Sequence, residues 1–102
     1  MLVTPELKLA VEIILPEVAN YTELSDAQGS DISNLCIRVD MCGGKRIEAS
    51  ASELRNVLLG AAEILVRTTS WRTAELAKSL IDWCANGLLR IKERNLAQRE
   101  VA

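Results

Sequence analysis

Two amphipathic stretches in the second half of the chain, joined by a short turn at residues 68–70, constrain the fold more than any other feature. Ser50 precedes Glu53 by three positions, the spacing of a capping box, so a helix is predicted to begin near residue 51. After a Thr or Ser cap, a second helix is predicted to begin at Trp71 and to continue to about residue 98. The sequence therefore predicts a long antiparallel helical hairpin over residues 51–98.

The two predicted helices carry more apolar surface than they can bury against each other. The first should be covered on two sides, because a second apolar strip flanks its main face and comprises Leu59, Ala62 and Val66. Its polar arc is predicted to hold Asn56, Gly60, Glu63 and Arg67. On the second helix Gly87 interrupts the apolar face, which indicates a close contact there. The residues expected to be buried between the helices are Leu58, Leu65, Leu80 and Cys84.

Residues 4–21 favour a further helix. Thr4 can cap it, and Pro5 suits its first position, where the missing N–H group costs nothing. Apolar side chains then recur at spacings of four and three residues, and Pro16 is expected to kink or split the helix. A strand is the alternative for residues 7–13, where apolar residues also alternate with other types.

The middle of the chain predicts a β-hairpin. Residues 22–32 are rich in turn formers and acids, and we expect them to form a loop. Apolar residues then alternate with other types over residues 35–41, which is the period of a half-buried strand. Gly43-Gly44 can form the tight turn that returns the chain as a second strand over residues 45–49. The predicted fold class is α+β, in the order helix, two-stranded β-hairpin, helix and long helix (α-β-β-α-α).

Length and charge limit the possible functions. The 102 residues predict one small domain, with an acidic part at 1–53 and a basic part at 54–102 that offset each other to a formal net charge of −2. This balance is far from the strongly basic composition of a dedicated nucleic-acid binder. No stretch predicts a signal peptide or a membrane span. Three cysteines at unrelated spacings indicate free thiols, so we expect a cytoplasmic protein.

The absence of histidine argues against catalysis. A serine or cysteine nucleophile that depends on an imidazole base cannot be assembled in this chain. The acids fall on predicted loops and solvated faces, and no segment has the ligand spacing of a zinc or calcium site. We therefore predict that the protein is not an enzyme and has no cofactor, metal or small-molecule substrate. A small carboxylate- or thiol-dependent enzyme is the weakest alternative.

An apolar and basic segment near the end of the last helix is the candidate partner-binding site. Leu89 and Leu96 lie seven residues apart, on a line that Ala85 continues and that faces away from the predicted hairpin contact. Basic residues flank this line at Arg90, Lys92, Arg94 and Arg99. The basic cluster also has a purely structural explanation, since cations stabilise the negative end of a helix.

The sequence predicts a non-catalytic protein–protein interaction module, such as an inhibitor, adaptor or assembly factor, possibilities that include phage- and plasmid-encoded proteins. It would dock through its helical hairpin or its sheet face, and a homodimer is the expected assembly. The alternative is a nucleic-acid-associated protein that uses the basic residues of the last helix. Salt separates the two, because phosphate binding weakens steeply with rising salt and an apolar contact does not. No membrane partner is expected.

Overall fold

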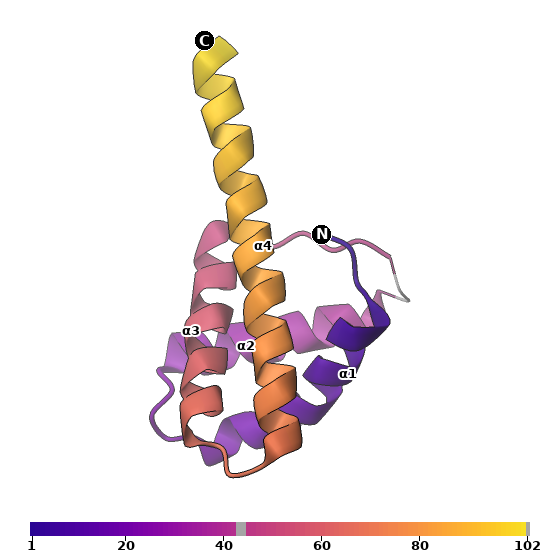
Figure 1. The fold of residues 1–102 in the computed structure, drawn as a ribbon, viewed down its shortest axis with the longest axis vertical. Helices are drawn as coiled ribbons and strands as arrows, with labels where there is room; N and C mark the ends of the chain where they lie inside the picture. Colours follow the sequence, from indigo (N-terminus) through magenta and orange to yellow (C-terminus); the bar gives the residue numbers. More distant parts are fainter. Residues whose placement is uncertain (43–44, 102) are drawn as a thin grey trace.

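The computed structural model describes residues 1–42 and 45–101, and its regular elements are helices (Figure 1). In chain order they are α1 (Pro5–Ile14), the 3-10 helix η1 (Leu15–Asn20), α2 (Asp26–Met41), α3 (Ala51–Arg67) and α4 (Trp71–Val101). Within the described ranges there is no β-strand, only an isolated antiparallel bridge between Leu2 and Arg46. The predicted α+β class is therefore wrong, and the fold is all-helical.

The C-terminal helical hairpin begins and turns where the sequence predicts, and α4 continues to Val101, beyond the predicted end at residue 98. The Ser50 hydroxyl accepts a hydrogen bond from the Glu53 backbone N–H at 3.1 Å, and α3 begins at the next residue after Ser50. At the start of α4, the Ser70 hydroxyl accepts from the Thr73 N–H at 3.3 Å. Local capping chemistry is thus sufficient to place the turn, and the predicted hairpin is confirmed.

Helix α2 occupies both the predicted loop and the predicted strand. It begins with a capping box, in which the Ser25 hydroxyl accepts from the Gln28 N–H and the Gln28 side chain accepts from the Ser25 N–H, both at 3.1 Å. This reciprocal cap begins a helix inside a segment whose composition is typical of a loop. The loop prediction for residues 22–32 is therefore wrong for most of its length, because α2 starts at Asp26.

The residues of the predicted strand pack with helical rather than alternating periodicity. On the buried face of α2 lie Ile32, Leu35, Cys36 and Val39. Two residues of the predicted strand face, Ile37 and Met41, are instead 50% and 80% exposed. The strand prediction failed because a short apolar run fits both periods and because Cys36 packs here as a small apolar residue.

Polar contacts join α2 to α3. The Asn56 side-chain amide donates to the Asp31 carboxylate at 2.7 Å. Arg38 forms an ion pair with Glu53, and its guanidinium also donates to the Glu48 carbonyl oxygen at 2.5 Å. Glu53 therefore has two roles: its carboxylate pairs with Arg38 of α2, and its backbone N–H donates to the Ser50 cap of α3.

Helix α1 confirms the helical reading of the N-terminal segment. The Thr4 hydroxyl accepts from the Leu7 N–H at 3.1 Å, and Pro5 occupies the first helical position. Pro16 ends the regular helix as expected, since the chain continues as the tighter η1 from Leu15. The strand alternative for residues 7–13 is excluded.

The segment predicted as the second strand of the hairpin pairs with the start of the chain. The Val3 N–H donates to the Lys45 carbonyl at 3.2 Å, and the Ile47 N–H donates to the Met1 carbonyl at 2.9 Å. The predicted Gly43-Gly44 turn lies outside the described residues. The β-hairpin prediction is wrong because its first strand is part of α2, so residues 45–47 find a different backbone partner.

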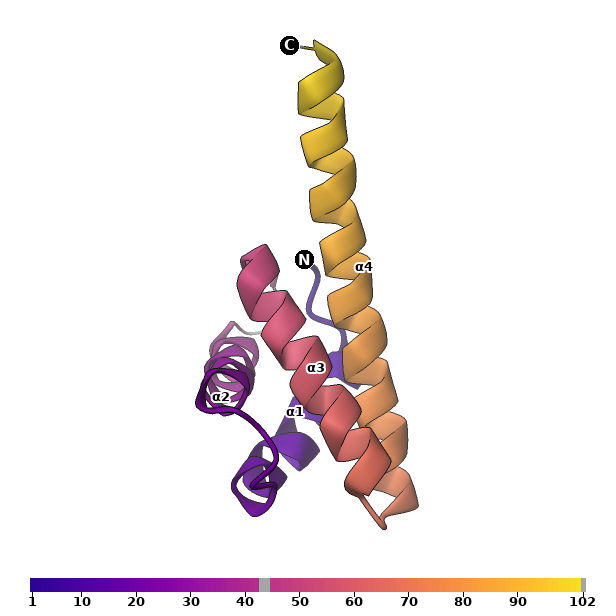
Figure 2. The same cartoon turned by 90° about the vertical axis from the view of Figure 1, so that its left-hand side faces the viewer.

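Helix α3 lies between α2 and α4, and α1 packs on α4 (Figure 2). The prediction that α3 is covered on two sides is confirmed, but α2 covers the side that holds Gly60 and not the predicted strip of Leu59, Ala62 and Val66. Gly60, placed on the polar arc by the sequence, is buried where α2 approaches so closely that a Cβ atom there would lie 2.5 Å from Ile32 Cδ1. Leu59 and Val66 of the second apolar strip are exposed. The small size of Gly60 is therefore what admits α2.

The centre of the α3–α4 contact matches the prediction in part. Leu80 and Cys84 are fully buried, whereas Leu58 and Leu65 are partly buried at the edge of the core. Gly87 is also buried, with the Met1 and Leu54 side chains against it, as its place on the apolar face indicates. The hairpin is thus held by a small-residue contact on α4 as well as by leucines.

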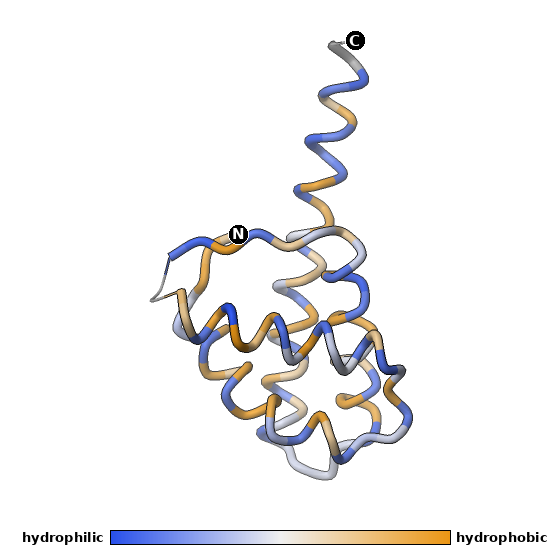
Figure 3. Tube along the Cα trace, turned by 180° about the vertical axis from the view of Figure 1, so that it is seen from behind, coloured by the Kyte–Doolittle hydropathy of each residue, from blue (hydrophilic) through white to orange (hydrophobic). Residues whose placement is uncertain are grey.

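Helix α4 runs well past the rest of the molecule. It has 31 residues and α3 has 17, and both views show its C-terminal part projecting beyond the start of α3 (Figures 1 and 2). At about 1.5 Å per residue, α4 is ~46 Å long, close to the 48 Å longest dimension of the molecule. Along the projecting part, apolar positions recur between hydrophilic ones (Figure 3).

Candidate functional site

The projecting part of α4, residues 89–99, is called here the free end. Beyond Ile91 every described side chain of this segment is exposed. Leu89 and Leu96 are 54% and 48% exposed, and Ala85 one turn earlier is exposed too. The outward line of apolar residues predicted from the sequence therefore lies on the surface of the molecule.

The structure divides the predicted site residues into two groups. At 100° per residue, Leu89, Lys92, Leu96 and Arg99 lie within about 80° of one another on the helix. Three of these, Lys92, Leu96 and Arg99, line a shallow groove with Ala51 at the start of α3. Arg90 and Arg94 lie on another side of α4 and line a different pocket.

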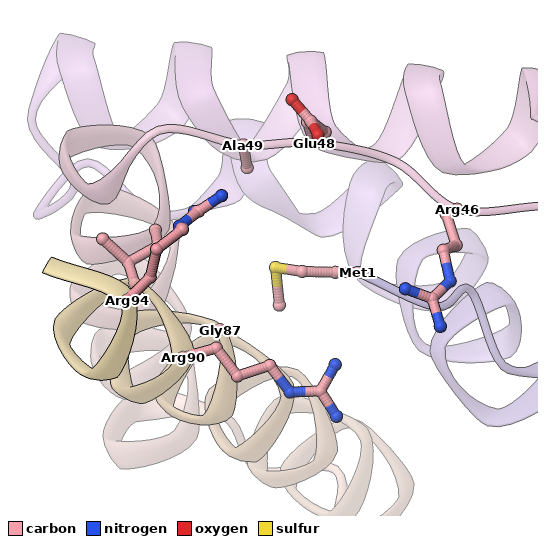
Figure 4. A pocket seen from close by; sticks show the side chains of 8 residues that line it. Met1, Arg46, Glu48, Ala49, Gly87, Arg90 and Arg94 are labelled. Atoms are coloured by element: carbon pink, nitrogen blue, oxygen red, sulfur yellow. The ribbon is translucent and has the colours of Figure 1, made fainter. Parts of the chain in front are cut away.

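That second pocket, of about 340 Å³, lies where α4 passes the start of the chain (Figure 4). Its floor includes the Met1 side chain, which fills the space left by the missing side chain of Gly87. Arg46 joins Arg90 and Arg94 around it, and the Glu48 carboxylate points away from Met1. We call Arg46, Arg90 and Arg94 the arginine pocket.

Basic side chains outnumber acidic ones around the arginine pocket. Among the side chains that the structure describes, no carboxylate lies within 4.0 Å of its three guanidinium groups. Arg90 and Arg94 are also four residues apart on one helix, a spacing at which like charges repel. The sequence analysis missed Arg46, which reaches the site only because residues 45–47 pair with residues 1–3.

A third surface feature is an apolar groove between α1 and α2, with a volume of about 410 Å³. Its apolar lining is Val11, Leu15, Pro16, Cys36, Ile37 and Met41. Each wall also carries an acid, Glu12 on α1 and Asp40 on α2. We call this the α1–α2 groove. Sequence reasoning could not place it, because the residues of α2 were assigned to a strand.

Two of the three thiols, those of Cys36 and Cys84, are poorly suited to nucleophilic chemistry. Burial raises the pKa of the Cys84 thiol to about 12. Burial likewise raises the pKa of Cys36 to about 12, outweighing a backbone hydrogen bond that acts in the opposite direction. Both thiols are therefore neutral near pH 7. In the described part of the chain, no three metal-binding side chains gather in one place.

Comparisons with other proteins give no further guide. No protein-family model, curated protein or solved structure matches the chain. None of the described helices has the length and apolar character needed to cross a membrane. Function must therefore be inferred from the free end, the arginine pocket and the α1–α2 groove.

Proposed function

We propose that the protein is a non-catalytic protein-binding module that docks through the free end of α4. The observation that carries this proposal is the exposure of Leu89 and Leu96 on a helix that continues beyond every neighbouring element. An apolar line of this kind, with bases beside it, is the pattern by which a helix enters a groove of another protein. The free end would therefore suit a partner surface that is apolar at its centre and acidic at its rim.

Two features of the interior support a non-catalytic role. The chain has no histidine, and its two buried thiols are neutral at physiological pH. A cytoplasmic location belongs to the same proposal and is supported by the three free cysteines, since unpaired thiols are typical of a reducing compartment. Inhibitor, adaptor and assembly factor are all roles that such docking can serve.

The proposal is tested by placing a charge on the apolar line. Leu89→Asp should abolish binding to whatever the wild type binds, while circular dichroism shows an unchanged helical fold, because Leu89 supports no core contact. Val66→Asp is the matched control, since Val66 is an exposed apolar residue of α3 outside the free end. Loss of binding in the Val66 variant, with the Leu89 variant unaffected, would move the interface to α3.

The arginine pocket favours a second candidate function, contact with the phosphates of a nucleic acid. Three guanidinium groups that have no described carboxylate within 4.0 Å are suited to phosphate oxygens. Binding of a duplex DNA or RNA should then weaken steeply between low and high salt, and Arg46→Gln should reduce that salt dependence. Docking through the leucines predicts little change with salt, so one titration separates the two functions.

A further inference from the structure

We infer that the α1–α2 groove receives the free end of α4 from a second copy of this chain, so that each copy fills the groove of the other. This inference rests on the proposed docking role of the free end and names its partner. It also assigns a function to the α1–α2 groove, which the proposed function leaves unused.

The free end cannot fill the groove of its own chain. Helix α4 is continuous from Trp71 to Val101, and in both views its free end points away from α1 and α2 (Figures 1 and 2). The groove and the free end are thus open on the same molecule and out of reach of each other. Only another copy can bring these two surfaces together.

Both surfaces expose apolar side chains. On the free end, Leu89 and Leu96 stand about 10 Å apart along one line of the helix. The floor of the groove is apolar, and three of its residues, Leu15, Ile37 and Met41, are exposed when it is empty. A helix laid between α1 and α2 would cover these residues with its own leucines, which is the burial that drives association.

The charges agree as well. Lys92 and Arg99 lie on the same side of the free end as the leucines, and Glu12 and Asp40 stand on the two walls of the groove. In the described part of the molecule, none of these four side chains has an oppositely charged group within 4.0 Å. Because Lys92 and Arg99 share one flank of the leucine line, docking would bring them toward one acidic wall of the groove, which favours one orientation and register of the helix.

Reciprocal exchange closes the assembly. If each copy offers one free end and one groove, two copies related by a two-fold axis satisfy both sites and leave no open end. The expected species is therefore a dimer, with twice the chain's mass of 11.2 kDa.

Charge reversal on each surface tests this arrangement. One variant carries Lys92→Glu with Arg99→Glu, which makes the free end acidic. The other carries Glu12→Lys with Asp40→Lys, which makes the groove basic. A control with Arg55→Glu and Arg72→Glu makes the same charge change as the first variant at exposed sites on α3 and the start of α4.

Light scattering with size-exclusion chromatography should show dimers for the wild type and the control, and monomers for each reversed variant alone. An equimolar mixture of the two reversed variants should form dimers again, because each acidic free end meets a basic groove and each basic free end meets an acidic one. Circular dichroism checks that all variants remain folded.

The inference is overturned if the wild type is monomeric, if either reversed variant alone stays dimeric, or if the mixture stays monomeric. The proposed function can fail or survive independently. A monomeric wild type whose binding to another protein is still abolished by Leu89→Asp removes self-docking and keeps the docking role of the free end.

Discussion

The two parts of α4, divided after Leu88, belong to one helix, yet only the first contributes fully buried side chains, and it is also the richer in apolar residues. From Trp71 to Leu88 the helix packs on α1 and α3, and Ala77, Leu80 and Cys84 are inaccessible to solvent. From Leu89 onward, Ile91 is the last residue that packs against the core, and residues 92–99 are exposed. The packing ends here because α3 begins beside Ile91, and Ala51 at its start forms only a shallow groove with the residues of α4 that follow.

This contrast shows what an amphipathic pattern means. Apolar residues at helical spacing indicate that a face can be buried, but the lengths of the surrounding elements decide whether the same chain buries it. In the part of α4 before Leu89, the packed half, the buried apolar side chains stabilise the fold. In the free half, from Leu89 onward, the pattern costs little stability and is available for another molecule.

The largest expected contrast concerns thiol chemistry in the packed region. Cys36 and Cys84 should react with iodoacetamide at pH 8 at least about a hundredfold more slowly than the half-exposed Cys42, because access is blocked and the reactive thiolate is scarce. Mass spectrometry of the alkylated peptides measures the three rates. In denaturant the rates should converge, and similar rates in the folded protein would contradict the packing described here.

The same two thiols predict how stability changes at high pH. Their pKa values lie above the ordinary 9.0 in the folded chain, so the unfolded chain loses these protons first. Their contribution to the free energy of unfolding is complete below about pH 9 and is lost as the pH rises toward 12. Urea denaturation of the wild type and of Cys84→Ala at pH 8 and pH 10.5 should show a smaller pH-dependent loss in the variant.

Truncation of a leucine in the packed half should be costly. Leu80→Ala removes a fully buried side chain between α3 and α4, and the free energy of unfolding should fall by about 2–5 kcal/mol. Chemical denaturation measures the change. A loss below about 0.5 kcal/mol would mean that the helical hairpin does not pack as described.

A smaller loss is expected where α2 meets α3. Gly60→Val should destabilise the fold by about 1–3 kcal/mol, because its side chain would collide with Ile32 in a filled core. Gly29→Ala on α2 is the matched control, since its nearest neighbour, Val18 Cγ1, lies at 3.7 Å and alanine favours the helix. Thermal unfolding of both variants should therefore show shifts of opposite sign.

The free half should show the smallest effect. Leu96→Ala is expected to change the free energy of unfolding of the monomer by less than about 0.5 kcal/mol, because the side chain is half exposed and lies beyond α3. Chemical denaturation at high dilution, where self-association is minimal, measures this change for the monomer. A loss as large as that of Leu80→Ala would show that the free end packs on its own chain.

The sequence predicts well those elements whose ends are marked locally. Caps at Thr4, Ser50 and Ser70 give the starts of α1, α3 and α4 correctly. Helix α2 was missed although Ser25 and Gln28 form an equally good cap, because Gln replaces the more familiar Glu and residues 26–31 carry a single apolar side chain, that of Ala27. Its alternating apolar residues then suggested a strand.

The surface features were only partly predictable. Leu89, Leu96 and the basic residues around them are visible as a pattern within one helix. The arginine pocket and the α1–α2 groove combine residues that are far apart in the chain, such as Arg46 with Arg90 and Glu12 with Asp40. Their positions depend on tertiary contacts, which single-helix periodicity does not encode.

The pairing of residues 1–3 with residues 45–47 also matters for synthesis of the chain. The Met1 amino group donates to the Ile47 carbonyl at 2.7 Å, across 46 positions, and the Trp83 indole N–H reaches the Leu2 carbonyl at 3.0 Å. Residues 1–3 therefore cannot complete these contacts until residues 45–47 and later Trp83 have been synthesised. Helix α1 can pack on α2 early but lacks its larger contact until α4 is made, and the α3–α4 hairpin, whose turn is local, then provides it.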